Sequence, residues 1–77
     1  MNIYISNLNS SIQSKNLVEL FSAYGNVDSA EIVMDLFSGE SRGFGYVEMA
    51  DDASAQKAIN TLHNSELESL IIAVQRA

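Results

Sequence analysis

RGFGYVEM, residues 42–49, is the stretch that decides the fold of this chain. Phe44 and Tyr46 stand two residues apart, so on a β-strand their rings point to the same face of a sheet. The residues that alternate with them would point to the opposite face. They are small and then apolar, as expected of a strand face that packs on helices: Gly43, Gly45, Val47 and Met49. We therefore predict a strand over 43–49 with an apolar inner face and an aromatic outer face.

A second strand signal lies at the N-terminus, over Asn2 to Leu8. Its apolar residues Ile3 and Ile5 alternate with Tyr4, so the tyrosine should point away from the core together with the polar residues of its parity. Two strands therefore each offer aromatic side chains on an outer face, and flat exposed rings are surfaces on which the bases of single-stranded nucleic acids stack.

Both segments resemble the signatures of the RNA recognition motif family. Residues 42–49 follow the longer signature, which runs basic, Gly, aromatic, Gly or Ala, aromatic, aliphatic, any residue, aromatic; only Met49 departs from it. Residues 3–8 resemble the shorter signature of aliphatic, aromatic, aliphatic, any residue, Asn, Leu. Two signatures in the right order are hard to produce by chance, so the resemblance covers essentially the whole chain. It extends to the small one-domain bacterial members, because the chain begins directly at the first strand.

Apolar periodicity predicts two helices. One runs over about 14–24, with an apolar stripe at i, i+3, i+4 and i+7 and Gly25 as its C-terminal stop: Leu17, Leu20, Phe21 and Tyr24. The other starts at Asp51 or Asp52 as its cap and buries a second stripe: Ala55, Ala58, Ile59 and Leu62. Further strands are predicted over 27–34, with Ala30 and Ile32 inward, and over 70–75, with Ile72 and Val74 inward.

The element order β-α-β-β-α-β predicts an α+β, ferredoxin-like fold. A four-stranded antiparallel sheet would carry both helices on one face and leave the other open. We expect residues 1–77 to form a single RNA recognition motif domain.

The family resemblance implies a binding site on the open sheet face. Strands one and three would lie side by side at its centre, where Tyr4 and Phe44 each stack under a base and Tyr46 packs on a sugar or bridges two nucleotides. Arg42 would meet a phosphate, and the end of the last strand would add hydrogen bonds. The expected RNA-binding set is Asn2, Tyr4, Arg42, Phe44, Tyr46, Gln75 and Arg76. The alternative is that these rings are ordinary strand formers covered by a partner protein or a terminal segment.

The charge of the chain argues against strong phosphate binding. Four basic residues stand against ten acidic ones, for a net charge of −6, and Lys and Arg contacts to phosphate supply most of the sequence-independent affinity of nucleic-acid binders. Three explanations remain open: weak, stacking-driven RNA binding, a basic tail beyond Ala77, or another partner for the sheet face. The expected partner is single-stranded RNA, with single-stranded DNA as a second ligand and a protein bound through the sheet face or the Phe37 loop as the alternative.

Several side chains allow more than one interpretation. Glu31 and Glu48 should point to the open face, as solvated charges or as acceptors for a base edge. Asp35 could pair with Arg42 across the hairpin. Phe37 could stack on a base, contact a protein or tuck against the sheet edge. His63 is expected to interact with the C-terminal dipole of the second helix.

Nothing in the sequence suggests an enzyme. It has one histidine and no cysteine, no phosphate-cradling glycine loop that opens a helix, and no Ser-His-Asp set. We therefore expect neither a metal nor a cofactor. Apolar runs are too short to span a membrane and no signal peptide is apparent, so a cytoplasmic location is expected.

Overall fold

The computed structural model describes all residues 1–77, and its elements follow the predicted order with one addition. The strands and helices are β1 (Asn2–Ser6), α1 (Ser14–Ser22), β2 (Ser29–Met34), β3 (Ser41–Glu48), α2 (Asp52–Leu62), β4 (Glu66–Leu67), β5 (Leu70–Ile71) and β6 (Ala73–Arg76). No helix is long and apolar enough to cross a membrane.

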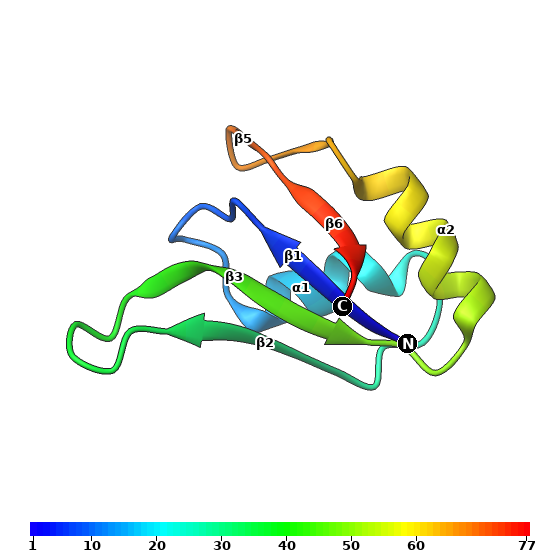
Figure 1. The fold of residues 1–77 in the computed structure, drawn as a ribbon, viewed down its shortest axis with the longest axis horizontal. Coiled ribbons are helices and arrows are strands. Elements are labelled where there is room, and N and C mark those ends of the chain that lie inside the picture. The colour runs from blue at the N-terminus through cyan, green and yellow to red at the C-terminus, as the bar shows by residue number, and fades with distance from the viewer.

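Four strands form one antiparallel sheet in the order β2-β3-β1-β6. The strands at its centre are therefore β1 and β3, which come from distant parts of the chain. Both helices lie on the same side of this sheet, and the two chain ends lie close together beside it (Figure 1). The predicted ferredoxin-like fold, with two helices on one face of a four-stranded antiparallel sheet, is confirmed.

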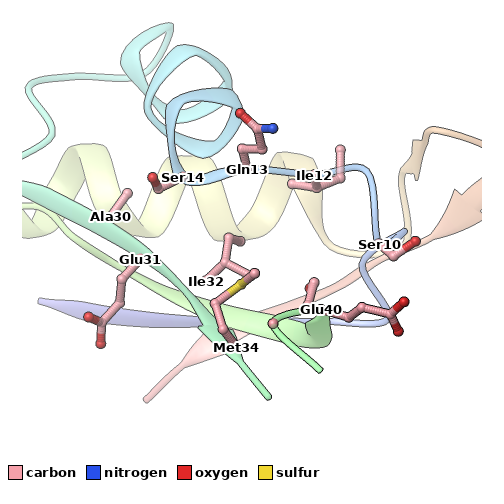
Figure 2. Close-up of a pocket in the computed structure, with 11 residues that line it drawn as sticks. Ser10, Ile12, Gln13, Ser14, Ala30, Glu31, Ile32, Met34 and Glu40 are labelled. Carbon is pink, nitrogen blue, oxygen red and sulfur yellow. The ribbon is translucent and has the colours of Figure 1, made fainter. Parts of the chain in front are cut away.

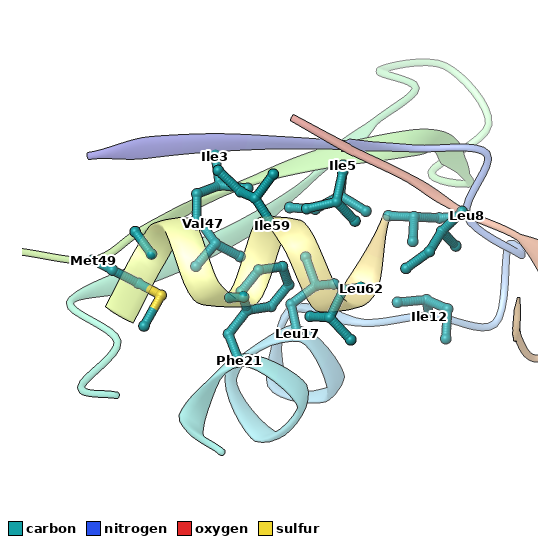
Figure 3. Packing of buried hydrophobic residues seen from close by; sticks show 14 residues of the cluster. Ile3, Ile5, Leu8, Ile12, Leu17, Phe21, Val47, Met49, Ile59 and Leu62 are labelled. Atoms are coloured by element: carbon teal, nitrogen blue, oxygen red, sulfur yellow. The ribbon is translucent and has the colours of Figure 1, made fainter. Parts of the chain in front are cut away.

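The core lies between the sheet and the helices (Figure 3). On the strands, Ile3 and Ile5 have no exposed surface and Val47 retains 1%. The apolar stripe predicted for the second helix is buried, as are Leu17 and Phe21 of α1. The predicted strand facing is therefore confirmed, because a slip of one residue would have placed these side chains in solvent.

The start of α2 is capped as predicted, whereas Gly25 does not have its expected role. Asp51 is the N-cap residue, and the hydroxyl and backbone N–H of Ser54 donate hydrogen bonds that lower the pKa of the Asp51 carboxyl. Helix α1 ends at Ser22, and Gly25 lacks the left-handed conformation of a helix-terminating glycine. Glycine is needed at position 25 because a side chain has no room there: a Cβ would lie 2.7 Å from the Ser54 side chain.

The end of the chain differs from the prediction in two ways. The single strand predicted over 70–75 is divided, because β5 pairs with the unforeseen β4 in a two-residue hairpin and only β6 joins the main sheet. His63, the C-cap residue of α2, also makes a contact that the prediction did not include. Its Nδ1 accepts a hydrogen bond from the backbone N–H of Val74 at 3.0 Å and so ties the end of the helix to β6.

Candidate nucleic-acid interface

Three aromatic side chains form one row on the open face of the sheet. Tyr4 lies directly opposite Tyr46 in the β1–β3 ladder, and Ser6 lies opposite Phe44. The ring centroid of Tyr4 is 5.4 Å from that of Tyr46 and 5.9 Å from that of Phe44, with interplanar angles of 50° and 49°. We call Tyr4, Phe44 and Tyr46 the ring row.

The buried sides of the same strands explain why the rings stay exposed. In β1 and β3 each ring neighbours a residue that is locked into the core, such as Ile3, Ile5 or Val47. Because adjacent side chains of a strand point to opposite faces, burial of one set fixes the other set outward. Tyr46 remains 38% exposed, whereas Tyr4 and Phe44 are half-buried.

The other predicted site residues are not all brought to this face. Gln75 lies opposite Tyr4 in the β1–β6 ladder and shares its face. Asn2 lies opposite Glu48 at the end of the same face. Arg76 lies opposite Ile3, a core residue, so its side chain leaves the sheet on the helix side. The structure therefore does not place Arg76 in the ring row, contrary to the expectation.

Arg42 lies at an irregular point of β3. The pairing with β2 shifts here, because Met34 pairs with Ser41 while Ile32 pairs with Gly45. Gly43, within this bulge, has φ +82°, a left-handed conformation that a side chain would disfavour. The Arg42 side chain is exposed and makes no ion pair.

The predicted pair between Asp35 and Arg42 does not form. A carboxylate oxygen of Asp35 instead accepts hydrogen bonds from the backbone N–H groups of Phe37 and Ser38, at 2.9 and 3.0 Å. These bonds, the one from Ser38 foremost, lower the pKa of the Asp35 carboxyl. The hairpin turn thus satisfies its own backbone donors and leaves the Arg42 guanidinium free.

Phe37 stands at the tip of the β2–β3 hairpin, which extends beyond the rest of the sheet (Figure 1). Its side chain is 99% exposed and that of Leu36 is 96% exposed. The interpretation in which Phe37 tucks against the sheet edge is therefore wrong. Stacking on a base and contact with a protein both remain compatible with its position.

A small pocket of about 330 Å³ adjoins the ring row on the β2 side, and sequence reasoning did not find it. Glu31 lies directly opposite Tyr46, and Glu48 lies opposite Asn2 and Ser29. We call this the edge pocket; its lining is Asn2, Ser29, Ala30, Glu31, Tyr46, Val47 and Glu48. The alternation of β2 and β3 had indicated that the two glutamates face outward, but their position around Tyr46 depends on strand register.

A larger hollow of about 650 Å³ lies on the helix side of β2 and is not part of this face. Figure 2 shows Ala30 and Ile32 on the side of β2 that faces α1, whereas Glu31 points to the opposite side of the strand. Both hollows border on β2, and Ala30 and Glu31 belong to the lining of each.

Comparison with known proteins connects this geometry to one family. The model of the RNA recognition motif matches residues 3–72. Polyadenylate-binding protein 2 of Arabidopsis thaliana is 47% identical over 62 residues, which are 80% of this chain but only 10% of that protein. The putative RNA-binding protein RbpE of Nostoc sp. is 36% identical over 77 residues, which are 100% of this chain and 78% of that protein.

Solved structures give the same result. The crystal structure of RNA binding protein PG1 superimposes with a TM-score of 0.98 at 42% identity and covers 100% of this chain and 93% of that one. A complex of the Sxl-lethal protein with RNA superimposes with a TM-score of 0.93 at 32% identity and covers 99% of this chain and 47% of that one.

Proposed function

The chain belongs to the RNA recognition motif family, and on this basis we propose that it binds single-stranded RNA through the open face of its sheet. The observation that carries the proposal is the ring row, in which the rings of Phe44 and Tyr46 each lie within 6 Å of the Tyr4 ring on the sheet face opposite the helices. Exposed rings in a row have no role in core packing, and they suit bases because every base has a π-face.

In the proposed mechanism stacking supplies most of the binding free energy. Tyr4 and Phe44 each lie under a base, and Tyr46 packs on a sugar or bridges two nucleotides. Each stacked base contributes roughly 1–3 kcal/mol. Two or three such contacts with little help from charge lead us to expect micromolar rather than nanomolar dissociation constants.

The polar residues around the row complete the proposed site. Arg42, whose guanidinium has no partner in the chain, meets a phosphate. Asn2 and Gln75, on the same face, offer amide groups to base edges. Arg76 enters only as a peripheral phosphate contact, since its strand position directs it to the helix side. Single-stranded DNA is a second expected ligand, because stacking does not require the 2′-hydroxyl.

We propose further that residues 1–77 act as one RNA-binding domain without enzymatic activity. The biological role would be post-transcriptional, in the cytoplasm: regulation, remodelling or stabilisation of transcripts. The second candidate function is protein–protein interaction with weak or no RNA binding. Two features favour it, namely the fully exposed Leu36 and Phe37 at the hairpin tip and the net charge of −6.

Two aromatic-to-alanine variants separate these candidates. Phe44→Ala removes a member of the ring row and should weaken binding of a short single-stranded RNA by about 1–3 kcal/mol. Phe37→Ala removes an exposed ring of the same kind outside the row, and it should weaken binding less than Phe44→Ala does if the ring row carries the RNA. A loss confined to Phe37→Ala would assign the stacking to the hairpin tip instead. Fluorescence anisotropy with a labelled mixed-sequence RNA measures both. Equal affinities for wild type and Phe44→Ala, with the fold intact, would refute the stacking mechanism.

A further inference from the structure

We propose that Glu31 and Glu48 give this face a base preference, in which the edge pocket favours nucleobases that present adjacent hydrogen-bond donors, guanine above all. This inference rests on the proposed RNA-binding function and specifies which RNA the same face selects. It concerns the part of the face beside Tyr46 that the ring row alone leaves without a role.

The geometry places two acceptors beside a stacking ring. Glu31 and Tyr46 are directly opposite partners on β2 and β3, and such pairs have their Cβ atoms about 5 Å apart. Glu48 is the next outward residue of β3 after Tyr46. All three side chains line the edge pocket, a hollow of about 330 Å³. A nucleotide whose sugar packs on Tyr46, or that Tyr46 bridges to its neighbour, can therefore turn its base edge into this hollow, within reach of both carboxylates.

Both carboxylates are free to accept hydrogen bonds from a ligand. Neither makes a side-chain hydrogen bond, and the one ion pair of the chain joins the N-terminus to Asp52. An ionised carboxylate has two oxygens that only accept. The exposed glutamates thus offer acceptors that no protein donor satisfies.

A phosphate group is the wrong ligand for this pocket. None of its lining residues is cationic, and Arg42 lies near the opposite end of β3 from Glu48. A phosphate here would meet two negative charges without compensation. The RNA backbone should therefore avoid the β2 side, which leaves the pocket to a base edge.

The donor pattern of the bases sets the order of preference. Guanine offers N1–H and the N2 amino group side by side, so one carboxylate can accept both hydrogen bonds. Cytosine and adenine each offer one amino group, and glutamate accepts from such groups in nucleic-acid recognition. Uracil offers a single N3–H between two carbonyl oxygens, which repel a carboxylate. We expect guanine to bind best and uracil least.

Inosine provides a sharp test, because it is guanosine without the N2 amino group of the base. The probes are uridine hexamers with one central guanosine, inosine or 7-deazaguanosine, titrated against the 77-residue chain. The wild type should bind the guanosine RNA about tenfold more tightly than the inosine RNA, within the range of a bidentate base contact. The 7-deazaguanosine RNA changes only N7, on the other edge of the base, and should bind like guanosine.

The variants Glu31→Gln and Glu48→Gln, singly and together, assign the effect. The double variant should bind guanosine and inosine RNA equally, within about twofold. Glu19→Gln, on helix α1, makes the same change in net charge as each single variant, but away from the open face, and should keep the wild-type preference for guanosine over inosine RNA. Because neither glutamate is buried, the fold should survive, and circular dichroism checks this.

Three outcomes would overturn the inference. Equal binding of guanosine and inosine RNA by the wild type would remove the base preference while leaving RNA binding intact. In the second outcome, the double variant keeps the wild-type ratio of affinities for guanosine and inosine RNA while binding all RNAs more tightly. That result would show that the glutamates only repel phosphate. Failure of the folded wild type to bind any hexamer would overturn the proposed function itself, and this inference with it.

Discussion

Substitution of Gly45 by alanine should damage the sheet at the edge of the proposed site. Gly45 is buried in β3 opposite Ile32 of β2. A Cβ at this position would lie 2.3 Å from the backbone oxygen of Glu31 and 3.2 Å from the Cα of Ile32. The oxygen belongs to the main chain and cannot rotate away, so β2 must move by about 1 Å to restore a normal contact. Overpacking of this kind costs about 1–3 kcal/mol, which lowers the melting midpoint of a domain of this size by about 5–20 °C.

Thermal unfolding followed by circular dichroism measures the loss, and hydrogen exchange locates it. Protection should fall for amides of the β2–β3 ladder, while the β1–β6 ladder keeps its protection. Gly39→Ala is the matched control, because no atom lies within 4 Å of the added Cβ. Its φ of +73° means that alanine lowers the free energy of unfolding only through backbone strain. The amides of the β2–β3 ladder should stay protected. A Gly45→Ala midpoint equal to or above that of the wild type would refute the reasoning.

Three further results are expected. Ile5→Ala and Val47→Ala, at core positions with 0% and 1% exposure, should each lower the free energy of unfolding by about 1–4 kcal/mol in urea titrations; an unchanged midpoint would contradict the strand facing. Ser69→Gly should raise that free energy by about 1 kcal/mol, because Ser69 has φ +73° in the β4–β5 turn and left-handed backbone is costly for any residue with a Cβ; a lower midpoint would argue against strain there. RNA affinity should depend weakly on salt, with a slope of log affinity against log salt of about −0.7 if Arg42 alone neutralises a phosphate and about −1.4 if Arg76 does so too; a slope of −3 or steeper would reveal phosphate contacts that the structure does not indicate.

The facing of the strands could be predicted from sequence because it depends on local alternation. Ile3, Ile5 and Val47 are apolar at every second position, and burial of that set leaves Tyr4 and Tyr46 outward. The contact between the two strands could not be obtained in this way. It joins distant parts of the chain, and only the resemblance to a known family predicted that β1 and β3 are neighbours.

The predictions that failed share a physical cause. Each concerned a hydrogen-bond partner, a turn or a strand register that the local sequence pattern does not determine. Asp35 binds backbone N–H groups of its own turn in preference to Arg42. The β4–β5 hairpin turns on Glu68 and Ser69, both at positive φ, without the glycine or asparagine that normally marks such a turn. The direction of Arg76 depends on its register with Ile3, and a slip of one residue would reverse it.

Amide chemical shifts recorded during titration with a short single-stranded RNA test the central claim most directly. The account predicts that the amides of Tyr4, Phe44 and Tyr46 shift together along one saturation curve with a micromolar midpoint. Amides on the exposed side of α2, such as those of Gln56 and Asn60, should stay in place. Shifts confined to the hairpin tip at 35–40, or no shifts at any RNA concentration from a folded protein, would contradict binding through the ring row.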